Sequence, residues 1–405
     1  IHLSIASMFS KSKMLSAATA TAAALSVASA EKWVMDSSTQ AQQIVGVGAW
    51  SQGNDIGAAS ANGVGGFMER YDGTEWYKET LGDATAGLLM DAATSDVVSV
   101  GVSMLPVVLS TDGGKTYVTS DAIQGISQSA TVFPPDSGEQ IGLVGSFSTG
   151  KGEPFVSGVA HSANRGETWT VSAVSGGDVR YGAFPSSDTW YVSAGMWGAD
   201  AIAPGASTGS LSSRLSFHQH EDHTYHLHEH AFNATAAASS LKDENGWWGK
   251  IFKTSDAGAT WENVFSSGAD DHYYFNNIAC ATNERCVAVT EGDAKDDFRA
   301  YVTQDGGQTW TNTLSNAVKP DDQVSLMGAG WVSDMEGWVA GTSKSGINLV
   351  GLFFKTVDGG ASWTLEQELN NCFPIDMAMA ANGKVGLAAC LSSSGGSATI
   401  ATLEQ

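Results

Sequence analysis

A short motif recurs along the chain, and this repeat limits the possible folds more than any other feature of the sequence. Its fullest form is Thr-x-Asp-Gly-Gly-x-Thr-Trp, found at residues 303–310. Five copies keep the pattern, and a sixth near the start is degenerate. The Asp or Asn of the six copies, in chain order, is Asp72, Asp112, Asn164, Asp256, Asp305 and Asp358. A period of about 20 to 50 residues indicates an array of similar structural units.

Each residue type in the motif suits a tight turn between two β-strands. An Asp or Asn side chain accepts hydrogen bonds from backbone N–H groups of its own turn, and Gly tolerates a positive φ. Apolar runs typical of strands precede the copies, such as Leu352-Phe353-Phe354 before Asp358. The aromatic residue that ends the motif then enters the next strand and packs into the core. We therefore predict that these carboxylates are structural and not catalytic.

The motif resembles the Asp-box, also called the BNR repeat, of sialidases, sortilin-type receptors, some glycoside hydrolases and photosystem II assembly factors of the thylakoid lumen. In those families it marks the turn between the third and fourth strands of a propeller blade. The resemblance implies an all-β chain folded as a seven-bladed β-propeller with Asp-box turns. Six or eight blades are also compatible with the spacing, because the long interval between Asn164 and Asp256 has room for another blade.

The two ends of the sequence are expected to meet in one blade. After Trp363 the chain has three further strand-like segments, near residues 374–380, 385–391 and 397–403, with no turn motif of their own. Residues 31–35 would supply the fourth strand. Such pairing closes the ring and removes exposed sheet edges.

Residues 1–30 are predicted to be a signal or targeting peptide. Lys11 and Lys13 precede an Ala-rich apolar core that ends in Ala28-Ser29-Ala30, the pattern that a translocase and its peptidase recognise. The apolar core is too short to span a bilayer, and we predict no membrane span in the mature chain. Residues 31–405 would form a single propeller domain with a His-rich insertion at about 199–245. The protein is expected to be exported, either secreted or delivered to an organelle lumen, with the thylakoid lumen among the candidate compartments.

The four cysteines form an even set, which in an exported protein favours disulfides. Cys280 and Cys286 flank a polar turn between two apolar segments and are the first expected pair. Cys372 and Cys390 bracket a second turn and form the other pair. A zinc site is the alternative, but no C-x-x-C spacing occurs.

The insertion contains six of the nine histidines within thirteen residues. These candidate metal ligands are His218, His220, His223, His226, His228 and His230. In an extended strand, a period of two would place His226, His228 and His230 on one face, as a Zn, Cu or Ni site requires. Two other interpretations stay open: a solvated loop with adventitious metal binding, and a pH sensor built from imidazoles. No other cofactor is expected.

Charge narrows the classes of function. The chain carries 43 acidic and 20 basic side chains, and its formal net charge of −23 argues against a nucleic-acid partner. A sialidase site would need three arginines, a Tyr/Glu pair and an Asp, and no segment of the sialidase Phe/Tyr-Arg-Ile-Pro type occurs. The arginines outside the turn motifs and the presumed disulfide loop are Arg70, Arg180, Arg214 and Arg299.

No catalytic residue can be assigned from the sequence. The chain resembles the photosystem II assembly factors in its size, its turn motifs and a segment Gly337-Trp338-Val339-Ala340-Gly341. This resemblance implies an exported scaffold without enzymatic activity that binds a protein partner. The alternative is a glycoside hydrolase or glycan-binding protein of the sialidase-like propeller group.

Overall fold

The computed structural model describes most of the chain between residues 31 and 404. The described residues are 31–36, 44–52, 55–62, 67–71, 75–80, 89–92, 98–101, 105–110, 112, 115–133, 140–149, 156–175, 179–196, 215–219, 225–229, 248–268, 271–292, 298–315, 323–345, 348–380, 386–391 and 398–404. Within these ranges all regular structure is β-strand. The predicted targeting peptide, residues 1–30, and Asp72 lie outside them.

Antiparallel sheets of consecutive strands account for the first half of the molecule. One sheet contains β2 (Ile44–Gln52), β3 (Asp55–Asn62), β4 (Phe67–Tyr71) and β5 (Trp76–Thr80). The next contains β6 (Leu89–Ala92), β7 (Val98–Gly101), β8 (Leu105–Ser110), β9 (Val118–Phe133), β10 (Gln140–Ser148), β11 (Val156–Ser162) and β12 (Thr170–Ala173). A third contains β13 (Val179–Ala183), β14 (Trp190–Met196), β17 (Trp248–Thr254) and β18 (Glu262–Ser266). Between β14 and β17 the chain forms a separate hairpin of β15 (Leu215–Gln219) and β16 (Tyr225–Glu229).

Three four-stranded sheets complete the second half. The first contains β19 (Tyr273–Cys280), β20 (Cys286–Gly292), β21 (Arg299–Thr303) and β22 (Thr311–Ser315). The second contains β23 (Gln323–Trp331), β24 (Gly337–Ser345), β25 (Asn348–Thr356) and β26 (Thr364–Asn370). The last contains β27 (Phe373–Met379), β28 (Gly386–Leu391), β29 (Ala398–Glu404) and β1 (Lys32–Asp36). The three C-terminal strands lie within one residue of the predicted segments.

The long strand β9 joins two sets of four strands into one sheet. Residues 118–125 of β9 pair with β8, whereas residues 124–133 pair with β10. The first half of β9 therefore completes the set of β6, β7 and β8, and the second half completes the set of β10, β11 and β12.

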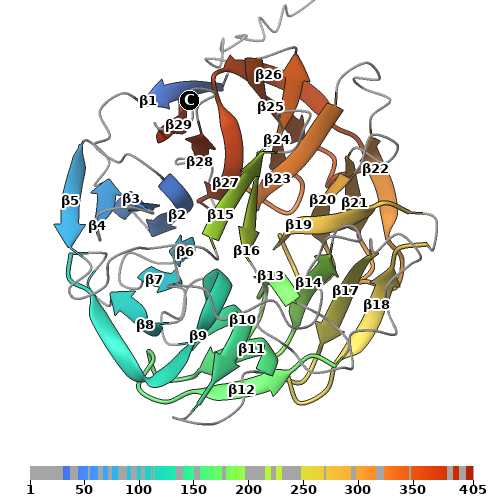
Figure 1. Ribbon diagram of the computed structural model, residues 1–405. Helices are drawn as coiled ribbons and strands as arrows, with labels where there is room; N and C mark the ends of the chain where they lie inside the picture. The colour runs from blue at the N-terminus through green and yellow to red at the C-terminus, as the bar shows by residue number, and fades with distance from the viewer. Residues whose placement is uncertain are drawn as a thin grey trace, which may run out of the picture.

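The sheets are arranged around a ring (Figure 1). Inner strands contact one another in the cyclic order β2, β6, β9, β13, β19, β23, β27 and back to β2. The outer strands, among them β5, β12, β18, β22 and β26, lie at the rim of the ring in Figure 1. Residues on the inner strands therefore surround the middle of the molecule.

The ring is closed by pairing between the two ends of the chain, as the sequence predicted. Strand β1 pairs antiparallel with β29, from Lys32 opposite Glu404 to Asp36 opposite Ile400. The side chain of Trp33 is wholly buried. Its ring stacks on Phe353 with centroids 4.6 Å apart. Hydrogen bonds of 2.7 and 2.6 Å join its backbone N–H and C=O to the side-chain amide of Gln367 in β26. The closing strand is thus fixed both to its own sheet and to the neighbouring one.

The recurring motif forms the turn between the third and fourth strands, as at Asp305. Asp305 Oδ1 accepts the backbone N–H of Thr309 at 2.9 Å, and Oδ2 accepts the Thr309 hydroxyl at 2.6 Å. Thr303 Oγ1 donates to Asp305 at 2.9 Å and accepts the N–H of Gly307 at 2.8 Å. Gly306 and Gly307 have φ values of 74° and 86°, a region that favours glycine.

These hydrogen bonds favour the ionised form of Asp305 and hold the pKa of its carboxyl below the ordinary value. The hydroxyl and N–H of Thr309 are the main causes. The third copy has Asn164 instead: its Oδ1 still accepts the N–H of Thr168 at 2.9 Å, while its Nδ2 lies 3.0 Å from Thr168 Oγ1 and can donate to it. An amide therefore satisfies the same turn without a charge.

We predict that Asp305→Asn keeps the fold and weakens the loss of stability in acid. A depressed folded-state pKa gives stability that is present above the unfolded pKa of about 3.9 and is lost as pH falls through the folded value. The variant should be less stable than the parent at pH 7, and this difference should shrink as the pH falls towards 2. Urea midpoints at several pH values measure this. The exposed Glu167→Gln is the control, and an unchanged difference between the variants at pH 7 and pH 2 would contradict the prediction.

In two copies of the motif, the tryptophan that ends it forms a hydrogen bond to the outer strand of the preceding set of strands. Trp261 Nε1 donates to Ser172 Oγ in β12 at 2.8 Å, and Trp363 Nε1 donates to Thr313 Oγ1 in β22 at 3.0 Å. Ser172 and Thr313 are both the third residue of their strands. In both cases a hydroxyl at the third position of the outer strand links that strand to the motif turn of the next set of strands.

At the equivalent joint between β18 and the Asp305 turn, the third residue is Val264. A Cβ added at Gly307 would lie 3.5 Å from Val264 Cγ2 and 3.6 Å from Trp310 Nε1, so both groups flank one glycine. The Trp310 Nε1 is buried and has no hydrogen-bond partner among the described residues. An unsatisfied buried donor costs about 1 to 3 kcal/mol.

Val264→Thr should therefore stabilise the protein by about 1 kcal/mol, because the new hydroxyl can accept the indole N–H. Chemical denaturation of the two proteins measures the difference. The same substitution in a Trp310→Phe background is the control, since phenylalanine has no N–H to donate. An equal gain in both backgrounds would refute the hydrogen-bond explanation.

Candidate functional site

Polar side chains from four strands gather near the middle of the ring. We call this set the central polar cluster, and it consists of Arg180, Tyr181, Tyr274, Asn276, Glu291 and Asp376. The residues come from β13, β19, β20 and β27. Three of these strands are inner strands of their sheets, which places the cluster around the ring's middle.

A carboxylate is the centre of the cluster. Glu291 Oε2 accepts hydrogen bonds from the Tyr274 hydroxyl at 2.7 Å and from Asn276 Nδ2 at 2.8 Å. Asn276 Nδ2 also lies 3.1 Å from the carbonyl oxygen of Leu326 in β23. The three residues whose side chains form these bonds are almost wholly buried, with exposed fractions of 3% for Tyr274 and 1% for Asn276 and Glu291. Burial without such partners would be costly, so these bonds fix the carboxylate in place.

Arg180 supplies the positive charge of the cluster and is only partly buried. Its guanidinium carbon lies 5.1 Å from the ring centroid of Tyr274 and 5.9 Å from that of Tyr181. Burial alone lowers the pKa of Arg180, but Tyr181, Tyr274 and Glu291 favour the charged form and raise it overall. Arg180 is therefore a stable cation held over aromatic faces.

The tyrosines stay protonated at ordinary pH. Burial raises the pKa of Tyr274, and the negative charge of Glu291 raises it further. Burial likewise raises the pKa of Tyr181, with the nearby charge of Asp376 acting in the same direction. The Tyr274 hydroxyl donates to Glu291, whereas the Tyr181 hydroxyl accepts a hydrogen bond from Arg180, and neither acts as a nucleophilic phenolate.

The cluster lies at the strand ends remote from the motif turns. Arg180 is the second residue of β13, and Tyr274, the second residue of β19, is paired with Glu291. The opposite ends of these strands lead to turns that contact the motif: the N–H of Ala257 bonds to Asp188 O at 2.9 Å, and that of Gly306 to Glu284 O at 3.0 Å.

The His-rich insertion leaves the sheet at the same end as Arg180. It connects β14 to β17 beyond the pair Met196 and Trp248, on the side where β13 begins. In the view of Figure 1 the hairpin β15–β16 projects over the middle of the ring.

A second cation occupies this end of the molecule and is already paired. Arg299, the first residue of β21, has its guanidinium 3.2 Å from the carboxylate of Asp271 and 4.5 Å from the ring centroid of Tyr273. Both of these partners precede or begin β19, in the same sheet as β21, which makes Arg299 a useful comparison for Arg180.

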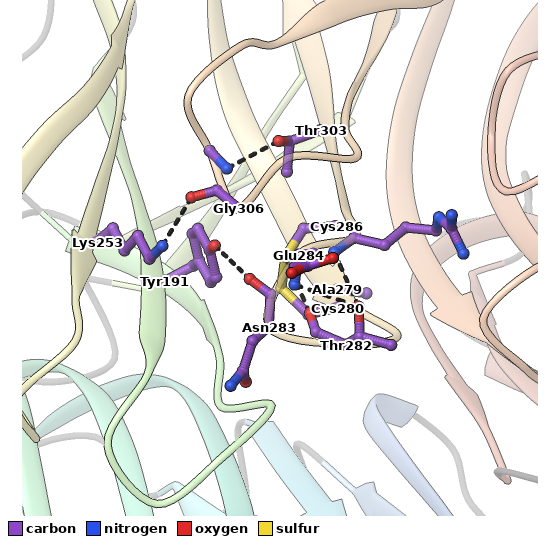
Figure 2. The surroundings of a disulfide bond; sticks show 12 residues. Tyr191, Lys253, Ala279, Cys280, Thr282, Asn283, Glu284, Cys286, Thr303 and Gly306 are labelled. Carbon is purple, nitrogen blue, oxygen red and sulfur yellow. Dashed lines mark hydrogen bonds between the residues drawn. A yellow bond between two sulfur atoms is a disulfide. The ribbon is translucent and has the colours of Figure 1, made fainter.

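The loop closed by Cys280 and Cys286 joins neighbouring sheets (Figure 2). The two cysteines face each other in the register of β19 and β20. Within the loop, Asn283 O accepts the hydroxyl of Tyr191 from β14 at 2.7 Å. Arg285 contacts the carbonyl of Asp334 in the turn between β23 and β24. The second disulfide joins Cys372 to Cys390 in β28.

Removing either disulfide should lower the free energy of unfolding, and by more for the disulfide that closes the longer loop. Loop-closure entropy predicts a loss of about 2 kcal/mol for Cys280→Ala/Cys286→Ala and about 3 kcal/mol for Cys372→Ala/Cys390→Ala. The cysteines are 6 and 18 residues apart, respectively. Urea unfolding of the two double variants measures both values. If the first variant loses clearly more than the second, the contacts of residues 281–285 depend on the disulfide to a degree that loop entropy does not capture.

The other residues singled out in the sequence do not belong to the central polar cluster. Asp112, Asn164, Asp256, Asp305 and Asp358 all lie in turns. His218, His226 and His228 lie in β15 and β16, while His220, His223 and His230 fall outside the described residues. Where the structure describes side chains, no three His, Cys, Asp or Glu are arranged to hold a metal ion.

Sequence reasoning identified only one member of the central polar cluster, as one of four candidate arginines. Tyr274, Asn276, Glu291 and Asp376 belong to no motif. Glu291 could have been recognised in the sequence as a candidate site residue. It follows the apolar segment Val287-Ala288-Val289 after one residue, and a carboxylate there would be costly to bury without a partner.

Comparison with known proteins identifies the fold. No family model matches the chain, and no curated protein matches it. The solved structures that resemble it include YCF48 bound to D1 peptide, with a TM-score of 0.54, 12% identity, and coverage of 92% of this chain and 96% of that one. YCF48 from Cyanidioschyzon merolae matches with a TM-score of 0.54, 11% identity, and coverage of 92% and 98%.

A third structure is an ulvan lyase of polysaccharide lyase family PL25 bound to -[GlcA(1-4)Rha3S]-. Its TM-score is 0.52 at 11% identity, with coverage of 91% of this chain and 95% of that one. No helix in the described part of the chain is long and apolar enough to cross a membrane. At these identities the likeness concerns the fold alone, and the chain is an all-β protein with the architecture of a β-propeller.

Proposed function

We propose that residues 31–405 form one exported, seven-bladed β-propeller with Asp-box turns that acts as a binding or assembly scaffold for a protein partner. The cyclic order of seven inner strands supports the blade number. Two disulfides support export, because such bonds persist in oxidising compartments.

The observation that carries the proposal is the position of Arg180 and Tyr181. They are adjacent and partly buried, they lie near the middle of the ring, and the buried Tyr274 and Glu291 support them. Tyrosine and arginine dominate the binding energy of protein interfaces when a rigid surround holds them. In a chain of net charge −23, a fixed cation also offers a local site for an acidic segment. That YCF48 has been solved with a bound peptide is in keeping with this use of the fold.

Glycan binding or hydrolysis is the second candidate. The hydrogen-bonded pair of Tyr274 and Glu291 beside Arg180 has the residue types of a sialidase site. Two facts argue against catalysis by this pair. Glu291 is only 1% exposed, so it is shielded from a substrate, and burial raises the pKa of Tyr274, whereas a nucleophilic tyrosine needs the opposite.

Binding of the partner should depend on Arg180. The mature chain would carry a photo-crosslinking residue at Tyr181 and be used to capture proteins from its source cells. We expect one discrete protein to be crosslinked, and Arg180→Gln to weaken its binding at least tenfold, which corresponds to about 1.4 kcal/mol. Arg299→Gln is the matched control, because it removes an arginine from the same strand ends that is paired with Asp271.

Thermal unfolding of each variant checks that the fold survives. Arg180→Lys separates charge from geometry, since lysine keeps the charge but loses the planar fork. Equal crosslinking by the Arg180 and Arg299 variants would contradict the proposal. Turnover of a glycoside that Glu291→Gln abolishes would establish the second candidate instead.

A further inference from the structure

Met335 is the most exposed methionine among those whose side chains the structure describes. It lies in the turn between β23 and β24, and 43% of its surface is exposed. Met327 and Met377 are buried, while Met35 and Met379 are partly buried. Because the oxidation of a side-chain sulfur depends on its exposure, Met335 is the methionine of this set that a dissolved oxidant reaches most easily.

The turn that carries Met335 has a fixed backbone. The N–H of Val332 donates to Glu336 O at 2.8 Å, and the N–H of Met335 donates to Ser333 Oγ at 3.3 Å. Met335 O in turn accepts the N–H of Gly359 at 2.8 Å, which ties the turn to the motif turn of the same sheet. The Met335 side chain therefore starts from a defined position.

The sulfur of Met335 contacts a cation from the neighbouring sheet. Arg285 Nη1 lies 3.5 Å from Met335 Sδ and also donates to the carbonyl oxygen of Asp334. Arg285 belongs to the loop closed by Cys280 and Cys286. A thioether sulfur is only a weak hydrogen-bond acceptor, so one N–H of a strong donor is used poorly here.

We propose that Met335 is a site of oxidation by hydrogen peroxide, and that Arg285 binds the sulfoxide that forms. The sulfur lone pair attacks one peroxide oxygen, an S–O bond forms and the O–O bond breaks. The proton on the transferred oxygen passes to the departing hydroxide, which leaves as water. Sulfur is thereby oxidised to the sulfoxide and peroxide is reduced. The N–H that faces the sulfur then donates to the sulfoxide oxygen, in a charge-assisted hydrogen bond.

Oxidation at this position would strengthen a contact between sheets. In a core, a sulfoxide is disruptive because it places a polar group among apolar ones. Met335 is exposed, so little packing is lost. The new hydrogen bond would join residues 281–285 of one sheet to residues 332–336 of the next, whose strands β20 and β23 are in contact. The proposal is independent of the partner proposed above.

Peptide mapping by mass spectrometry of the full chain after treatment with hydrogen peroxide tests the reactivity. We expect Met335 to be oxidised about tenfold faster than Met327 and Met377. All four cysteines are in disulfides, so no thiol competes for the oxidant. Oxidation of Met335 at the rate of the buried methionines would overturn the proposal.

Hydrogen exchange before and after oxidation tests the role of Arg285. In the oxidised parent, the amides of residues 281–285 and 332–336 should exchange about tenfold more slowly. Met335→Leu should show no such change, because it forms no sulfoxide. Arg285→Ala should still be oxidised but lose the slowing, whereas the matched control Arg299→Ala should keep it.

A second variant leaves Arg285 in place and needs no oxidant. Met335→Gln provides an amide oxygen as a permanent acceptor, and it should slow exchange in the same two segments. Thermal unfolding of each variant checks that the fold survives. Equal slowing on oxidation with and without Arg285, or unchanged exchange in both the oxidised parent and Met335→Gln, would overturn the binding of the sulfoxide by Arg285.

Discussion

Pairing of the first described strand with the last is the contact on which the ring depends. Strand β1 completes the sheet of β27, β28 and β29 by pairing with β29, and so ties the two ends of the described chain into one sheet. Lys355 reinforces the joint from the neighbouring sheet, with its ammonium 2.6 Å from carboxylates of both Glu31 and Glu336. Burial lowers the pKa of Lys355, but the two carboxylates outweigh it and raise the pKa overall. This contribution is therefore complete at neutral pH and declines only as pH rises above the ordinary lysine value of about 10.4.

The bonds that hold neighbouring sheets together lie mainly at one end of the strands. At that end, the motif turns at Asp256, Asp305 and Asp358 are tied to the first hairpin of their own sets, as the bond from Gly359 N–H to Met335 O illustrates at 2.8 Å. The loop between Cys280 and Cys286 adds links to both neighbouring sheets at this end. Because these bonds already determine how the sheets sit together, the connections at the other end are not needed for that purpose. This explains why a long insertion between β14 and β17 leaves the surrounding strands paired.

Features that follow from local patterns could be predicted, and features that depend on register could not. The closing strand and the C-terminal strands were predictable because apolar segments and turn residues alternate along the chain there. The central polar cluster was not, since its residues are far apart in sequence and meet only through strand pairing. A bulge between Phe275 and Asn277 shifts the register within β19, yet Tyr274 stays opposite Glu291. No spacing rule in the sequence anticipates that pair, and the same holds for His218 opposite His226.

A binding site in the middle of a ring needs both a rigid base and a variable entrance. The base is present in Glu291, whose two hydrogen bonds hold Tyr274 and Asn276 and thereby the platform beneath Arg180. The entrance can vary because the insertion leaves from the same strand ends without contributing to the sheets.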